Sequence, residues 1–280
     1  MPRWNNLLVA LALCVGVVSP GLAQSAEQPR LALMGTVPIY WGEAAGLNEM
    51  LTGDAPAHWA RGVLEEDFTL APLDYLTHDT LAGHRYLLMA QPRGLSPEEN
   101  VALDSWVRAG GRLLLFADPM MTGESRFHVG DRRRPQDVAL LSPILAYWGL
   151  EMHFDVSQPD GTRVVDHMGV PLPVNLRGKL ERAEGAQNCR IPGDGLLAHC
   201  SIGEGQALVV ADAAMLDIAD PDSRSERALH HLAAHIFQIF GDETGKGQHA
   251  AHEAPENGAN SRQTGASHHH HTRAESLNSE

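Results

Sequence analysis

The chain has 280 residues, of which 43% are apolar, and its 35 acidic against 21 basic side chains give a formal net charge of -14. An acidic chain of this kind argues against nucleic acid and against an anionic membrane surface as partners. The apolar content is typical of a soluble globular protein rather than a membrane protein.

The N-terminus has the pattern of a secretory signal. Arg3 is followed by an apolar run over residues 7–18 and by the small-x-small sequence Gly21-Leu22-Ala23. The run is shorter than the roughly 20 residues that a membrane span needs. We therefore predict a signal peptide over residues 1–23, cleaved after Ala23, a periplasmic or secreted protein, and no strong membrane affinity after cleavage. An uncleaved anchor is the alternative.

Export would leave two cysteines, Cys189 and Cys200, in an oxidising compartment. A pair of this kind, close together in the sequence, is predicted to form a disulfide. The alternative is that both are small buried apolar residues.

The C-terminal segment from residue 241 onward has almost no large apolar side chains. Such a composition cannot offset the entropy lost on ordering, so we predict a disordered tail over residues 241–280 and one folded region over residues 29–240. The tail contains a run of histidines, which could bind zinc, copper or nickel. That run comprises His268, His269, His270 and His271. No other cofactor is expected.

The first half of the folded region reads as alternating strands and helices. Apolar strands are predicted over residues 31–34, 68–73 and 86–90, the last ended by Gln91 and Pro92, and a helix is predicted over residues 56–66.

A second helix in this half has a complete set of boundary signals. Ser96 and Glu99 have the spacing of a capping box, Pro97 occupies the first helical position, and Gly110-Gly111 ends the helix. The strand that follows, residues 112–116, is apolar almost throughout, as strands of a parallel sheet are when both faces are buried. Strand, helix and strand together predict a right-handed βαβ unit.

The second half is less regular. A helix is predicted over residues 137–149, bent or divided at Pro143, and a strand over residues 151–156. Short strands separated by glycine and proline are predicted over residues 160–205, then an apolar strand over residues 206–216. A last helix over residues 225–240 has a second possible capping box in Ser223 and Glu226.

Two stretches carry a resemblance, "LSPEENVALDSWVRAGGRLLLFADP" and "GEGQALVVADAAMLD". Over residues 31–240 the chain resembles the auxiliary, extracytoplasmic component of gliding-motility-type ABC transport systems. It is also similar to the class I glutamine-amidotransferase-like flavodoxin fold. The resemblance implies a three-layer α/β fold with a mostly parallel sheet flanked by helices, and some short antiparallel strands in the second half. It also implies an envelope or transporter protein partner.

Catalytic motifs are missing from the sequence. The amidotransferase relatives would place a cysteine nucleophile after the third strand, where this chain reads "MAQPRG", and no cysteine lies between Cys14 and Cys189. There is no G-x-S-x-G elbow and no phosphate-binding loop. These absences from the sequence argue against glutaminase and serine-hydrolase chemistry.

Carboxylates follow three of the predicted elements: Glu43, Asp118 and Asp212. In a parallel sheet they would gather at the edge where ligands bind. Paired carboxylates could perform acid–base chemistry or hold a metal. The preferred interpretation of Asp118 and Asp212 is that they close turns through side-chain to backbone hydrogen bonds.

The loop "GTVPIYWGE" lies at the same predicted edge. Its Thr36, Tyr40 and Trp41, together with Gln91, are candidates for ligand or partner binding, because aromatic residues in loops often form binding surfaces. The alternative is that Trp41 folds back over the edge of the sheet. His231 and His235, one turn apart on the last helix, are interpreted as solvated residues rather than metal ligands.

Taken together, these patterns predict an exported, non-catalytic α/β binding or scaffold module associated with an envelope transport complex. The alternatives are a hydrolase that uses the carboxylate edge (Glu43, Asp118 and Asp212) and metal capture by the histidine-rich tail. Whether the protein is an enzyme stays open at this point.

Overall fold

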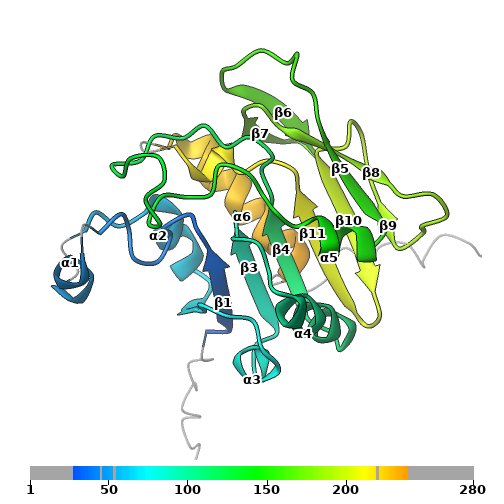
Figure 1. Ribbon diagram of the computed structural model, residues 1–280, viewed down its shortest axis with the longest axis horizontal. Helices are drawn as coiled ribbons and strands as arrows, with labels where there is room; N and C mark the ends of the chain where they lie inside the picture. Colours follow the sequence, from blue (N-terminus) through cyan, green and yellow to red (C-terminus); the bar gives the residue numbers. More distant parts are fainter. Residues whose placement is uncertain (1–27, 45, 53–54, 219–220, 239–280) are drawn as a thin grey trace, which may run out of the picture. The chain divides into compact units, whose positions relative to one another are not determined.

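The computed structural model describes residues 28–44, 46–52, 55–218 and 221–238 (Figure 1). The chain divides into two units, Met1–Phe240 and Gly241–Glu280, and every described residue belongs to the first. The predicted signal peptide and the predicted tail with its four consecutive histidines lie outside the described residues. Within the described ranges, no helix is long and apolar enough to cross a membrane.

One seven-stranded sheet organises the described region. Its strands are β1 (Arg30–Gly35), β2 (Thr69–Pro72), β3 (Tyr86–Ala90), β4 (Arg112–Phe116), β9 (Cys189–Arg190), β10 (Leu197–Ile202) and β11 (Gly205–Val210). They lie in the order β2-β1-β3-β4-β11-β10-β9. The first five run parallel, and β10 and β9 continue the sheet in antiparallel pairing. The prediction of an α/β protein with a mostly parallel sheet is confirmed.

Two small antiparallel sheets and several helices complete the unit. The small sheets pair β5 (Leu150–Phe154) with β8 (Gly178–Arg182) and β6 (Arg163–His167) with β7 (Val170–Val174). The helices are α1 (Leu47–Thr52), α2 (Trp59–Glu65), α3 (His78–Leu81), α4 (Pro97–Arg108), α5 (Ser142–Tyr147) and α6 (Ser223–Phe237), with a 3-10 turn η1 (Ala214–Leu216). The short antiparallel strands expected in the second half are therefore present.

The central strands bury both of their faces. Alternate residues of β3 enter two different apolar clusters, so that Leu88 packs in the cluster that contains α6 and Leu87 in the cluster that contains α4. Figure 1 shows α4 in front of the sheet and α6 behind it. Helices thus flank the sheet, and burial on both faces accounts for the uninterrupted apolar sequence of β3 and β4. A three-layer, flavodoxin-like arrangement stays a prediction.

The boundaries of α4 are those predicted. The Ser96 hydroxyl accepts a hydrogen bond from the Glu99 amide at 3.2 Å, and the Glu99 carboxylate accepts one from the Ser96 amide at 2.9 Å. Past the C-terminus of the helix, Gly110 has a φ of 106°, a conformation that residues with a Cβ rarely adopt.

Three predicted elements differ from the structure at their boundaries. The helix predicted over residues 137–149 is only α5, because Pro143 lies in its first turn, where the missing amide has no helical partner to lose. The strand predicted to reach residue 216 ends at Val210. The last helix is capped by Asp222, whose side chain accepts from the Arg224 amide, and not by Ser223.

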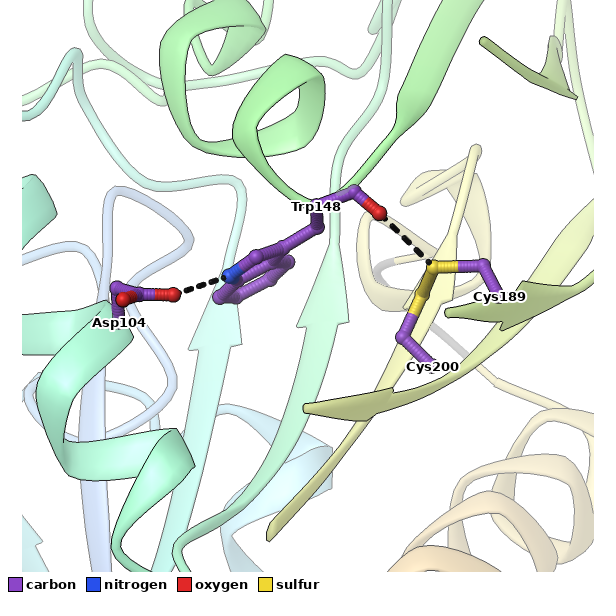
Figure 2. The surroundings of a disulfide bond; sticks show 4 residues. All are labelled: Asp104, Trp148, Cys189 and Cys200. Atoms are coloured by element: carbon purple, nitrogen blue, oxygen red, sulfur yellow. Dashed lines mark hydrogen bonds between the residues drawn. A yellow bond between two sulfur atoms is a disulfide. The ribbon is translucent and has the colours of Figure 1, made fainter. Parts of the chain in front are cut away.

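The predicted disulfide is confirmed. Cys189 of β9 and Cys200 of β10 are bonded across the antiparallel edge of the sheet, and both are buried. Figure 2 shows the surroundings of this bond: the Cys189 sulfur lies 3.6 Å from the carbonyl oxygen of Trp148, whose indole nitrogen donates to Asp104 at 3.0 Å. The disulfide therefore packs directly on the buried end of α5.

Candidate functional site

Asp118 joins the carboxyl ends of two neighbouring parallel strands. It follows β4, and its Oδ1 accepts a hydrogen bond from the Met120 amide at 2.8 Å. Its Oδ2 accepts from the Ala213 amide, just beyond β11, at 3.0 Å. The side chain is 0% exposed. Both carboxylate oxygens therefore fix the backbone of the loops that leave the sheet.

Asp212 has the same role one strand further along. Its Oδ1 accepts from the Ala214 amide at 2.8 Å, and its Oδ2 accepts from the Asn175 amide at 3.0 Å. The residue is 1% exposed. Asp212 thus ties the end of β11 to the segment after β7, and the predicted turn-closing role of both aspartates agrees with these contacts.

Gln91 connects this edge to β1. Its φ of 46° places it in the left-handed region, and its side chain is buried. The side-chain oxygen accepts from the Asp118 amide at 2.7 Å, while the side-chain nitrogen donates to the carbonyl oxygens of Asp118 and Gln136 at 3.0 and 2.9 Å. Thr36 donates to the Gln91 carbonyl at 2.5 Å and accepts from the Gln136 amide at 2.9 Å. Four predicted site residues (Thr36, Gln91, Asp118 and Asp212) therefore lie at one edge in structural roles, all but Thr36 fully buried.

Burial makes both aspartates weaker acids than usual. Loss of solvent raises the pKa of Asp118 to about 6, against the opposing effect of its two backbone donors. Burial, followed by the charge of Asp118, raises the pKa of Asp212 well above its ordinary range. Two carboxyl groups this close resist ionising together, so the pair retains a proton to higher pH than isolated carboxyls would.

Glu43 does not join this network. Its carboxylate accepts from the Ser125 hydroxyl at 2.5 Å and from the Arg126 amide at 3.0 Å. It therefore holds a different loop, the one that follows β4. The three predicted carboxylates do not converge on one open pocket.

Tyr40 and Trp41 lie in different environments. Tyr40 is partly buried against the core, and the Arg61 guanidinium lies 4.7 Å from the centre of its ring. Trp41 meets Tyr40 edge to face at 4.7 Å and remains 48% exposed. Trp41 thus presents an aromatic surface to solvent, beside a loop anchored by Tyr40.

A pocket of about 260 Å³ opens next to this edge. His58 and Asp217 line it, and the sequence patterns identified neither of them as a site residue. Its polar lining is formed by Glu43, His58, Glu124, Arg126 and Asp217. In the described part of the chain, no group of three or more His, Cys, Asp or Glu side chains is arranged to hold a metal ion. Apolar side chains such as Val37, Pro38 and Leu216 form the rest of its wall.

Asp217 is the most perturbed group of the pocket. Burial, followed by the charges of Asp118 and Glu43, raises its pKa to about 7. No hydrogen bond to its carboxylate forms among the described residues, and a Cβ at position 123 would have to displace the Asp217 side chain. A carboxyl of this kind can accept or donate a proton near neutral pH.

His58 has a fixed tautomer. Its Nδ1 accepts from the Ala60 amide at 3.2 Å, which caps α2, so Nε2 donates to the Leu216 carbonyl at 2.7 Å. Burial lowers the pKa of this imidazole. A neutral ring with both nitrogens occupied is a positioning residue. It ties α2 to η1, immediately before Asp217.

The sequence contained a weak signal for one of these residues. His58 lies inside the helix predicted over residues 56–66, and the structure begins α2 one residue later, with His58 as its N-cap. Asp217 follows Asp212 after a short 3-10 turn, and only the path of that turn directs it into the pocket.

Asp217→Asn is expected to stabilise the protein at about pH 8 by roughly 1–2 kcal/mol, allowing for solvent screening of a half-buried group. Because the folded pKa is raised, the folded protein holds a proton that the unfolded chain releases between about pH 4 and pH 7. The proton held by Asp217 therefore stabilises the folded wild type at low pH, and this contribution is lost as the pH rises from about 4 through about 7. The difference in free energy of unfolding between Asp217→Asn and the wild type should vanish near pH 4. Urea unfolding at both pH values measures it, and an equal effect at both would contradict the raised pKa.

No family model and no curated protein matches the chain. Among solved structures, the chain is similar to the exo-beta-1,4-mannosidase Op5Man5 from Opitutaceae bacterium strain TAV5, with 14% identity and a TM-score of 0.45 over 76% of this chain and 36% of that one. It is also similar to the mmIFT52 N-terminal domain, with 15% identity and a TM-score of 0.44 over 76% and 98%. A putative ThuA-like protein from Bacteroides uniformis ATCC 8492 has 8% identity and a TM-score of 0.43 over 76% and 94%. The chain thus spans about a third of the mannosidase, and similarity at this level assigns it neither a family nor an activity.

Proposed function

We propose that the protein is an exported, non-catalytic α/β binding or scaffold module that serves an envelope transport complex. The observation that carries this proposal is the use of the carboxylates at the sheet edge. Both oxygens of Asp118 and both oxygens of Asp212 accept backbone amides, and both side chains are fully buried. A general acid or base must reach the substrate, and these groups are occupied in holding loops.

Three further features support the proposal. The sequence resembles the auxiliary component of gliding-motility-type ABC transport systems, which implies a three-layer flavodoxin-like fold and an envelope or transporter protein as partner. The signal-peptide pattern at the N-terminus supports export and cleavage after Ala23. The buried Cys189–Cys200 disulfide is of the kind that persists outside the cytosol.

The connection between β1 and α2 supplies a candidate surface for that partner. Trp41, Leu47 and Leu51 are 48%, 70% and 77% exposed within this one connection. Leu47 and Leu51 lie on α1, and Trp41 precedes this helix. Exposed large apolar side chains are typical of protein-binding surfaces, and tryptophan is enriched among the residues that dominate binding energy. The Glu43 contacts with the loop at Ser125 and Arg126 hold the start of this connection in place.

Trp41→Ala is expected to weaken capture of the envelope partner roughly 30-fold, as truncation of a central aromatic contact costs about 2 kcal/mol. The measurement is chemical cross-linking and affinity capture from envelope membranes, with captured proteins identified by mass spectrometry. Val156→Ala is the matched control, since Val156 is 87% exposed and lies elsewhere. Equal loss of the transport component in both variants would contradict a specific surface at Trp41.

A hydrolase is the second candidate, and one observation favours it. The Asp217 carboxylate has no hydrogen-bond partner among the described residues, burial raises its pKa to about 7, and it lines the same pocket as Glu43. The acid–base group of such an enzyme would be Asp217, rather than Asp118, Asp212 or Glu43, because both Glu43 oxygens also accept hydrogen bonds from the loop at Ser125 and Arg126. Binding of zinc, copper or nickel by His268, His269, His270 and His271 is a separate prediction for the tail.

A further inference from the structure

Four histidines from distant parts of the chain gather between β10 and α6. His167 ends β6, His199 lies in the middle of β10, and His231 and His235 lie one turn apart on α6. The ring centres are 5.0 Å apart for His199 and His235, 5.9 Å for His167 and His199, 6.2 Å for His167 and His231, and 6.3 Å for His231 and His235. The interpretation of His231 and His235 as solvated residues was therefore wrong: they face other imidazoles across the interface between the helix and the strands.

The hydrogen bonding of the cluster is incomplete. The Nε2 atoms of His167 and His231 are buried and have no partner. The Nε2 of His235 lies 3.3 Å from the Nδ1 of His199. A buried ring nitrogen without a partner costs about 1–3 kcal/mol, so two of them in one cluster call for an explanation such as an unseen ion or water.

We propose that His167, His199, His231 and His235 form a binding site for a late first-row divalent metal ion such as zinc, copper or nickel. Imidazole is the side chain most often used for these ions. Tetrahedral zinc with metal–nitrogen distances of about 2.0–2.1 Å separates its ligand nitrogens by roughly 3.3 Å. The nitrogens of His199 and His235 lie at that separation, but they share a hydrogen bond that metal binding would have to break.

Two charged side chains lie near the cluster. Arg190 opposes a bound cation, while Asp166 lies near His167 and favours one.

The site requires side-chain movement and has a route from solvent. Since no three such side chains in the described residues are yet arranged around an ion, two or more rings must turn about their side-chain bonds, and the terminal torsion of histidine is broad and soft. A polar pocket of about 690 Å³ reaches His199 and His235 from solvent. An ordered water that bridges the two unpartnered nitrogens is the rival occupant.

The test uses cobalt(II) as a probe, because a tetrahedral cobalt site has a strong visible absorption that six-coordinate cobalt lacks. It uses the full-length chain with the tail histidines (residues 249, 252 and 268–271) replaced by asparagine, so that the tail does not bind the metal. We expect one equivalent of cobalt to give the tetrahedral spectrum. His235→Gln and, separately, His199→Gln should weaken binding at least about tenfold, as even changes beyond the direct ligands cost 10–100-fold.

His78→Gln is the matched control, since that side chain is 95% exposed and lies on α3. It should leave the spectrum and the affinity unchanged. Absence of a tetrahedral spectrum in the tail-substituted chain would overturn the proposal and leave water as the occupant, as would unchanged affinity in both glutamine variants. Thermal melting without metal identifies a variant that fails to fold, in which case the other variant decides.

Discussion

Replacing Asp118 by leucine is expected to lower the free energy of unfolding by about 2–5 kcal/mol. The carboxylate accepts hydrogen bonds from the half-buried amide of Met120 and the buried amide of Ala213. A buried amide left without an acceptor costs roughly 1–3 kcal/mol. The Gln91 side chain, which holds the backbone of Asp118, cannot replace either bond because its own groups are occupied. Urea unfolding at about pH 7 and at about pH 5 measures the loss, because burial raises the pKa of Asp118 to about 6 and removal of its charge offsets part of the loss at about pH 7.

Asp118→Asn serves as the graded control. Asparagine keeps one side-chain oxygen and so can accept only one of the two amides, and its NH2 group would face the other donor. We expect a cost of about 1–3 kcal/mol, smaller than that of leucine. A leucine variant less than about 1 kcal/mol below the wild type would show that Asp118 does not hold these loops.

Removing the disulfide is expected to cost roughly 3 kcal/mol. Cys189 and Cys200 are 11 residues apart in the sequence, and closing a loop of about a dozen residues in the unfolded chain gives this value in the chain-entropy model. The natural comparison is between the wild type and Cys189→Ala/Cys200→Ala, unfolded in urea without reductant.

Reductant provides the control for this second prediction. It should destabilise the wild type toward the double variant and leave the variant unchanged. The protein purified under native, oxidising conditions should also have no titratable thiol in its mature form. Two free thiols, or a double variant as stable as the wild type, would contradict a stabilising bond between β9 and β10.

The sequence predicted the helices and strands best where local signals and the burial pattern agreed. The capping box at Ser96 and Glu99 and the glycines after residue 109 placed α4 correctly, and the apolar run of β4 indicated a strand buried on both faces. Each of these signals lies within a few residues of the feature that it specifies. The helix predicted over residues 137–149 shows the opposite case. Its apolar pattern begins before residue 142, but there the Ala139 amide donates to the Asp118 carbonyl, and α5 begins only at Ser142.

The candidate sites were harder to predict because they depend on contacts between distant residues. Asp118 was correctly interpreted from its local context, but its Oδ2 bond crosses 95 residues to Ala213. The contact between His199 and His235 spans 36 residues, so the helical spacing of His231 and His235 alone could not show that a strand histidine faces them. Asp217 carries no motif, and its raised pKa comes from burial that only the folded chain creates.

The most direct test of the central claim is a turnover assay on the purified mature protein with panels of esters, phosphoesters and glycosides. The wild type and Asp217→Asn should both remain at the rate of the uncatalysed reaction, while both keep the partner captured through the Trp41 loop. The contradicting result is turnover by the wild type that Asp217→Asn abolishes while its melting temperature stays at or above that of the wild type.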